Sequence, residues 1–182
     1  MSEPSDATVL VADDEEALVE LYAAFLADRY EVRTATNGEA AVALADEAVD
    51  VVVLDRRMPG TTGDEVLSTL RADENRYQIA MLTAVEPERG IIDLPFDDYR
   101  TKPVDKRELR STVEVLLRRQ EYDERSQEFF WLASKKAALE AAGNVESEEY
   151  ERLTEEIETA RAKVDATLDG VDARDAFVDL RP

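Results

Sequence analysis

The 182-residue sequence contains no cysteine and no histidine. Without cysteine, the chain can form neither a disulfide nor a thiolate metal site. Without histidine, it can be neither a histidine kinase nor a phosphohistidine carrier, so any phosphohistidine chemistry requires a partner. No stretch approaches the roughly 20 continuous apolar residues of a membrane-spanning helix, so no membrane insertion is expected. Residues 1–6 lack the basic and apolar segments of a secretory signal, which predicts a cytoplasmic protein.

Positive charge is also scarce in this chain. The 22 Lys and Arg residues face 43 Asp and Glu residues, which gives a formal net charge of −21 and a pI near 4.3. Such self-repulsion destabilises a compact chain unless salt screens it, and molar salt shortens the Debye length to about 3 Å. We therefore predict a halophilic protein, with an acidic mesophilic protein as the alternative. The same charge disfavours indiscriminate DNA binding, which depends on Lys and Arg at phosphates.

Short segments with the composition of strands alternate with helical patterns. Strands are expected at about residues 8–12, 30–34, 49–54, 79–82 and 98–101. Helices are expected at about residues 18–26, 38–46, 62–72 and 109–117. This alternation predicts βαβ units, a five-stranded parallel sheet and right-handed crossovers. The continuous apolar runs predict central strands that helices cover on both faces.

Reactive or charged residues stand where the predicted strands end. Asp13 and Asp14 follow the first strand, Asp55 the third, Thr83 the fourth and Lys102 the fifth. The carboxyl ends of parallel strands meet at one edge, where open α/β sheets bind their ligands. Three carboxylates repel one another unless a cation is present, and hard oxygen ligands suit Mg²⁺. A hydroxyl and an ammonium beside them can hold phosphate oxygens, so the set predicts phosphoryl transfer onto a carboxylate.

Four motifs around these residues occur in the order found in one known family. They are Asp13-Asp14-Glu15, Leu54-Asp55-x-x-Met58-Pro59-Gly60, Leu82-Thr83-Ala84 and Tyr99-x-x-Lys102-Pro103. With them the chain resembles the response regulator receiver domains of two-component systems over residues 7–120. The resemblance implies a flavodoxin-like doubly wound sheet. It also implies a phosphorylated signalling switch that assists only its own phosphorylation and dephosphorylation, and is otherwise not an enzyme.

The resemblance also assigns the nucleophile and the metal ligands. Asp55 is implied as the residue that accepts a phosphoryl group from a sensor histidine kinase. Mg²⁺ is the implied cofactor, with Asp14, Asp55 and the Arg57 backbone carbonyl as direct ligands and Asp13 acting through water. Asp13 and Asp14 are in addition expected to cap the following helix. The alternative for Asp55 is an ordinary turn residue before a Pro-Gly pair.

Two further residues are implied to hold the phosphoryl group, and one to respond to it. Thr83 would hydrogen-bond the group and Lys102 would pair with it. Tyr99 would be an aromatic switch that turns inward as Thr83 moves. A strand-end hydroxyl and plain packing are the alternatives for Thr83 and Tyr99. Residues 86–90 and 94–95 contain Pro and Gly that disfavour a long helix between these two switch residues.

Residues 121–182 have the pattern of a small α-helical hairpin domain. Gly143-Asn144 is expected to break the hairpin, and Phe177, Val178 and Leu180 form a short apolar tail. Apolar residues mark the two helices at Phe129, Leu132 and Leu139, and at Tyr150, Leu153, Ile157, Ala160, Val164 and Leu168. The layout resembles the HalX domain that follows receivers in haloarchaea. Phe129, Phe130 and Trp131 are expected to face the receiver, the tail or a second chain.

The leading functional hypothesis is a response regulator that relays phosphorylation of Asp55 through its helical module. The module would bind an output protein or form a homodimer through the C-terminal helices. A second hypothesis is a DNA-binding transcription regulator, supported only by Arg118-Arg119 and Lys135-Lys136, which solvated helix faces explain better. A third is a small phosphoester hydrolase that uses the acidic edge of the sheet.

Overall fold

The structure is a computed structural model that describes residues 7–73, 77–84, 94–141 and 148–169. Contacts between Cα atoms divide the chain into two compact units, residues 1–117 and 118–182. We call these the receiver unit and the helical unit. The predictions for residues 86–90, Gly143-Asn144 and the apolar tail lie outside the described residues.

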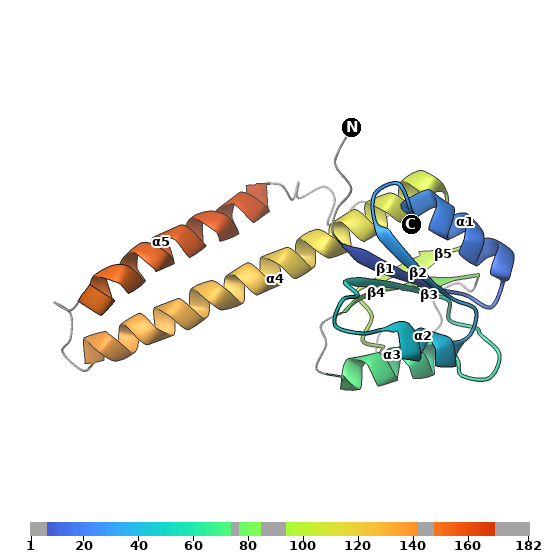
Figure 1. Ribbon diagram of the computed structural model, residues 1–182, viewed down its shortest axis with the longest axis horizontal. Coiled ribbons are helices and arrows are strands. Elements are labelled where there is room, and N and C mark those ends of the chain that lie inside the picture. The colour runs from blue at the N-terminus through green and yellow to red at the C-terminus, as the bar shows by residue number, and fades with distance from the viewer. Residues whose placement is uncertain (1–6, 74–76, 85–93, 142–147, 170–182) are drawn as a thin grey trace, which may run out of the picture. The chain divides into compact units, whose positions relative to one another are not determined.

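The receiver unit is built on a parallel five-stranded sheet with the order β2-β1-β3-β4-β5, which confirms the predicted architecture (Figure 1). The strands are β1 (Thr8–Ala12), β2 (Glu31–Ala35), β3 (Val51–Leu54), β4 (Gln78–Thr83) and β5 (Asp98–Thr101). Every residue of β1 and β3 is buried, as their continuous apolar runs predicted. The chain reverses its direction of winding between these two strands, which places the topological switch point at their carboxyl ends.

Helices cover both faces of this sheet (Figure 1). One face packs against α2 (Gly38–Leu44) and α3 (Gly63–Ala72), and the other against α1 (Glu16–Leu26) and the start of α4 (Lys106–Ala141). Alternate residues of the strands serve the two clusters: Leu10 and Val52 belong to the first, and Val9 and Val53 to the second. The sheet therefore has a separate apolar core on each side.

Local signals in the sequence fix where two of these helices begin. The side chain of Asn37 accepts a hydrogen bond from the Ala40 backbone N–H at 2.8 Å and caps α2. Thr62 and Glu65 form a capping box at the start of α3, in which each side chain bonds the backbone N–H of the other. The loop that follows Asp55 therefore ends at a capped helix start at Thr62.

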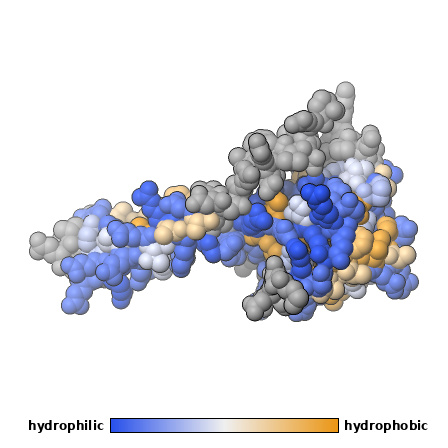
Figure 2. Space-filling model, turned by 90° about the horizontal axis from the view of Figure 1, so that it is seen from above, coloured by the Kyte–Doolittle hydropathy of each residue, from blue (hydrophilic) through white to orange (hydrophobic). Residues whose placement is uncertain are grey.

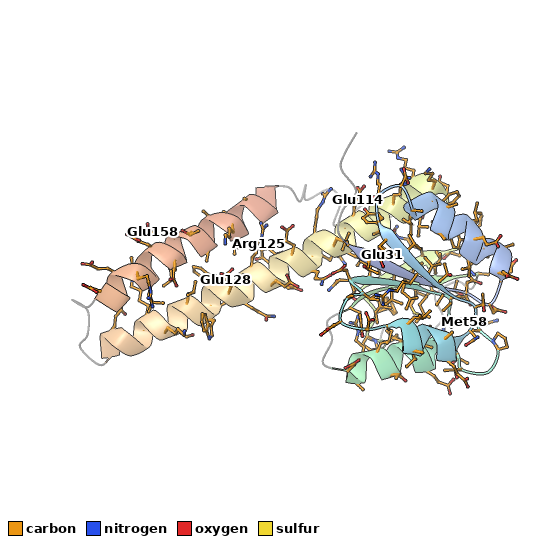
Figure 3. The ribbon with its side chains drawn as sticks, viewed as in Figure 1. Glu31, Met58, Glu114, Arg125, Glu128 and Glu158 are labelled. Carbon is orange, nitrogen blue, oxygen red and sulfur yellow. The ribbon has the colours of Figure 1, made fainter. Side chains whose placement is uncertain are left out.

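The helical unit consists of the second part of α4 and of α5 (Glu148–Asp169). Their contact buries Leu132, Leu153 and Ala160, with Phe129 and Ile157 packed against them, so the apolar stripe predicted for α5 is confirmed at Leu153, Ile157 and Ala160. Arg125 of α4 lies between the two helices (Figure 3). None of the helices among the described residues combines the length and the apolarity needed to cross a membrane.

Two expectations for α4 need correction. Phe129 was expected to face the receiver, the tail or a second chain, but it packs on the core of the hairpin itself, whereas Phe130 and Trp131 are exposed. The patterns at residues 109–117 and 129–139 also belong to one continuous helix rather than two. Between Lys106 and Ala141 the sequence has no Gly or Pro, so nothing in it ends the helix.

Candidate functional site

The candidate site lies at the carboxyl ends of β1, β3, β4 and β5. Each of its strand-end residues has its backbone N–H hydrogen-bonded to a neighbouring strand, which continues the sheet by one residue. The bonds are Asp13 N to Ala35 O at 3.1 Å, Asp55 N to Ala12 O at 2.8 Å and Lys102 N to Thr83 O at 2.8 Å. Regular strand pairing, and not a flexible loop, therefore determines where these side chains start.

Three carboxylates meet at this edge, as the sequence predicted. Oxygen atoms of Asp13, Asp14 and Asp55 all lie within 4.8 Å of one another. Asp13 and Asp55 are only 3% and 5% exposed, whereas Asp14 lies at the surface. Buried like charges at this distance disfavour one another. The residues fit a hard divalent cation, because all three offer oxygen ligands and one of them opens to solvent.

Lys102 lies between two of the carboxylates. Its Nζ is 2.5 Å from Asp13 Oδ2 and 2.8 Å from Asp55 Oδ1. Burial alone would lower the pKa of Lys102, but hydrogen bonds to Asp13 and Asp55 outweigh it and leave that pKa above its ordinary value. The lysine thus stays an ammonium, and the three carboxylates with this one cation carry a formal charge of −2.

The remaining oxygens of the buried aspartates are held by the backbone. Asp55 Oδ2 accepts a hydrogen bond from the Arg57 N–H at 2.7 Å, and Asp13 Oδ1 accepts one from the Glu15 N–H at 3.0 Å. The expectation that Asp13 and Asp14 cap α1 is wrong. Glu15 occupies the N-cap position, and no side chain makes the capping bond there. The backbone direction after β1 turns the two aspartates toward Asp55 instead.

Thr83 and Tyr99 occupy neighbouring strands on the same side of the site. Thr83 ends β4 and is 1% exposed. Tyr99 lies half-buried on β5, packs against the cluster shared with α2 and α3, and has its ring centroid 5.6 Å from that of Phe96. Thr83 thus lies at the end of β4, and Tyr99 lies two residues before the end of the edge strand β5, in register with Met81.

Sequence reasoning missed Arg56, which connects three elements at the edge of the site. Its Nε lies 3.1 Å from Asp64 Oδ1 on α3. Hydrogen bonds to Asp64 and then to Tyr99 raise the pKa of Arg56 above its ordinary value. Arg56 and Asp64 also border an open pocket of about 590 Å³, whose lining is Asp14, Arg56, Arg57, Met58, Pro59, Thr62 and Asp64. No spacing rule in the sequence pairs Arg56 with Asp64 or Tyr99, so only the fold could reveal this contact.

Gly63 is the second residue that sequence reasoning missed. Its backbone N–H donates to Arg56 O at 2.9 Å and so ties the start of α3 to the loop after β3. A Cβ at this position would lie 2.1 Å from Asp55 O and 2.7 Å from Arg56 Cα, far inside contact distance. The absence of a side chain at Gly63 therefore lets α3 approach the backbone of Asp55.

Two family models match this chain. Residues 9–114 match the response regulator receiver domain, and residues 118–180 match the HalX domain. A proposed transcriptional regulator of Haloferax volcanii is 41% identical over 168 residues, which cover 90% of this chain and 29% of that protein. The alkaline phosphatase synthesis transcriptional regulatory protein PhoP of Bacillus subtilis is 41% identical over 118 residues, which cover 62% of this chain and 49% of PhoP. This chain therefore spans half or less of the length of these relatives.

A solved structure supports the same comparison. The response regulator protein TrrA of Thermotoga maritima, determined in complex with Mg²⁺ and BeF, is 34% identical with a TM-score of 0.55. The match covers 61% of this chain and 99% of TrrA. The match thus covers almost all of TrrA, and the matched part of this chain is about as long as the receiver unit.

Proposed function

This chain belongs to the response regulator receiver domain family, and we propose that it is a cytoplasmic two-component response regulator phosphorylated on Asp55. In this proposal a sensor histidine kinase supplies the phosphoryl group. The receiver domain spans residues 7–120, and the HalX-like helical domain of residues 121–182 passes the signal to an output partner.

The observation that carries this proposal is the environment of Asp55. The carboxylate is 5% exposed, with one oxygen on Lys102 and the other on the Arg57 N–H, beside two further carboxylates. Asp13, Asp14 and Asp55, together with the Arg57 carbonyl, would hold Mg²⁺. The ion would neutralise the clustered charge and orient phosphoryl oxygens, as Mg²⁺ does in phosphoryl-transfer sites generally. TrrA, with its bound Mg²⁺ and BeF, supports this assignment.

The chain's own residues would carry out the transfer by positioning and charge. An oxygen of Asp55 attacks the phosphorus, the new oxygen–phosphorus bond forms, and the nitrogen–phosphorus bond of the donor phosphohistidine breaks, with its electron pair left on the imidazole. The Lys102 ammonium would move its hydrogen bonds from Asp55 to the incoming phosphoryl oxygens. Thr83 Oγ1 would donate to another phosphoryl oxygen. The donor must be another protein, because this chain has no histidine.

The signal would leave the site through Thr83 and Tyr99. A phosphoryl group that draws Thr83 toward Asp55 frees space beside β5, and Tyr99 would turn into that space. Such a movement would break the Tyr99 contact with Arg56, so Arg56 would favour the resting position of the ring. The switch is then a two-state element that the new negative charge biases.

Transcription regulation is a second candidate function. It rests on the described roles of the relatives from Haloferax volcanii and Bacillus subtilis. The observation against direct DNA binding is charge, because the chain carries −21 and α5 alone has eight acidic against three basic residues. Retention on DNA at matched ionic strength would favour this candidate.

The test is phosphorylation by the small donor phosphoramidate with Mg²⁺, followed by intact-mass measurement. The native chain is expected to gain one phosphoryl group, and Asp55→Asn none. Asp123→Asn, at an exposed position of α4, is the matched control and should react like the native chain. Unchanged labelling of Asp55→Asn would overturn the proposal. Steady phosphoester turnover that survives Asp55→Asn would instead identify a hydrolase.

A further inference from the structure

The side of α4 that points away from the hairpin core carries two exposed aromatic residues. Phe130 is 67% exposed and Trp131 58% exposed. With 3.6 residues per turn, Phe130 lies about 200° around the helix from Leu132, which faces α5, and Trp131 lies about 100° from it. We call this side the aromatic face and define it by its exposed residues Gln127, Phe130, Trp131, Ser134 and Ala137. Large apolar side chains grouped in this way mark an interaction surface more often than single exposed residues do.

The aromatic face between Gln127 and Ala137 carries no charge of its own, and the exposed Asp123 lies on the same side of α4 one turn before Gln127. None of its five residues is charged, although hydrophilic residues cover most of the surface visible in Figure 2. Residues 118–141 of α4 contain five acidic and five basic residues, whereas α5 has a net charge of −5. Two copies of a chain with net charge −21 repel each other over most of their surface. The aromatic face is a place where they can meet with less of that repulsion.

One flank of the face is acidic before Trp131 and basic after it, so it would be complementary in charge to the same flank of a second, antiparallel copy. Glu124 and Glu128 precede Trp131 on this flank, and Lys135 follows it one turn later. In an antiparallel pair of identical helices, the same flanks meet head to tail. Centred near Trp131, such a pair would place each Lys135 beside Glu128 of the second copy. Flanking charges of this kind add little affinity but set the orientation of paired helices.

One aromatic side chain is already ordered for contact. Lys135 Nζ lies 3.5 Å from the centroid of the Trp131 ring, a cation–π contact that restricts the indole. A side chain held in one position loses less entropy when a partner binds. The aromatic residues of two copies would bury on the order of several hundred Å², less than the roughly 1,200 Å² of a stable interface. The expected association is therefore weak and reversible.

We propose that the aromatic face of α4 binds the same face of a second copy of this chain in antiparallel orientation. The association does not require phosphorylation of Asp55, so its failure would leave the proposed function intact. In such a dimer, the second copy would cover Phe130 and Trp131, which the hairpin core leaves exposed.

The test is sedimentation of the full-length chain in molar KCl over a range of concentrations. The native chain is expected to shift from monomer to dimer as concentration rises. The double variant Phe130→Gln with Trp131→Gln should raise the dissociation constant by about tenfold or more. Leu21→Gln, at an exposed apolar position of α1, is the matched control and should not change it. Circular dichroism should show unchanged helix content in all variants.

A charge exchange tests the orientation. Lys135→Glu should weaken the dimer, and adding Glu128→Lys should restore it, because the two residues would pair between copies. A native chain that stays monomeric at every concentration would overturn the proposal, as would a dimer that the double aromatic variant leaves unchanged. If only removal of residues 170–182 allows dimers to form, the chain's own terminus occupies the face and the proposal is wrong.

Discussion

The two units of this chain differ in what holds them together. The receiver unit has an apolar cluster on each face of its sheet, and strand residues such as Leu10 and Val52 are completely buried. In the helical unit, among the described residues, the buried cluster consists of Leu132, Leu153 and Ala160. Each fully buried aliphatic side chain contributes about 1.5–3 kcal/mol. The receiver unit can therefore hold a precise site, whereas the helical unit depends more on helix propensity, polar links and its surroundings.

This difference fits the division of labour that we propose. Asp13, Asp55 and Lys102 start from backbone positions fixed by strand pairing, so their side chains can be held within the narrow tolerances of phosphoryl transfer. A hairpin with a small core can change its association or order for a small free-energy cost.

The largest expected effect comes from removing core volume on the receiver side. Leu10→Ala should lower the free energy of unfolding by about 2–5 kcal/mol, because Leu10 is completely buried at the centre of the sheet. Leu153→Ala should leave receiver stability unchanged and loosen the hairpin. Trp131 is the single tryptophan and lies in the helical unit, so its fluorescence reports that unit while far-ultraviolet circular dichroism reports both. Equal shifts of both signals in both variants would show one cooperative unit and break the comparison.

Gly63→Ala should have the next largest effect. Its Cβ would meet the backbone of Asp55 and Arg56, so the loop after β3 must move, at a cost of about 1–3 kcal/mol. Because that movement displaces Asp55, binding of the phosphoryl mimic beryllofluoride with Mg²⁺ should weaken as well. Gly60→Ala is the matched control: Gly60 has φ 76° and open space around it, so strain lowers stability without moving the site. Equal beryllofluoride affinity in both variants would contradict this role of Gly63.

The strands and the strand-end residues were predictable from the sequence because they depend on local pattern. Apolar runs identify buried strands, and parallel strands bring Asp13, Asp55 and Lys102 to one edge whatever the details of the loops. The contact of Arg56 with Asp64 and the approach of Gly63 to Asp55 depend on how α3 packs, which no local pattern encodes. Phe129 was misplaced for a related reason. Three adjacent aromatic residues look alike in sequence, and only the helix rotation decides which of them faces the core.

A smaller effect is expected at the start of α3. Thr62→Ala removes one half of the capping box and should cost about 1 kcal/mol of receiver stability. The helical unit should be unaffected, since its helices lie outside this contact. Urea unfolding read by circular dichroism and by Trp131 fluorescence separates the two responses. A loss seen equally by Trp131 would mean that the two units unfold together.

The same capping box predicts a pH dependence of receiver stability. Hydrogen bonds from Thr62 hold the pKa of Glu65 below its ordinary value of 4.5. A lowered folded-state pKa contributes stability above the unfolded pKa and loses it as pH falls through the folded value. Below about pH 4.5 the native chain should therefore lose stability more steeply than Glu65→Gln. Parallel pH curves for the two chains would exclude a contribution from Glu65.

The smallest expected effect concerns the polar link within the helical unit. Arg125 Nη1 donates to the Lys163 carbonyl of α5 at 3.1 Å, and Nη2 pairs with Glu121 of its own helix. Arg125→Met keeps the apolar stem and should cost about 0.5–1 kcal/mol, measured by Trp131 fluorescence in urea.

Arg152 provides the matched control for this prediction. Among the described residues its ion pair is with Glu156 of its own helix at 3.6 Å, and its side chain is 70% exposed, so Arg152→Met should change almost nothing. If Arg125→Met costs no more than Arg152→Met, the hydrogen bond from Arg125 to the Lys163 carbonyl adds no stability. Among the described residues, the hairpin would then depend mainly on the apolar cluster of Leu132, Leu153 and Ala160 with Phe129 and Ile157 packed against it. If Arg125→Met costs clearly more, the Arg125 hydrogen bond stabilises the hairpin alongside the bond from the Tyr150 hydroxyl of α5 to Glu140 of α4.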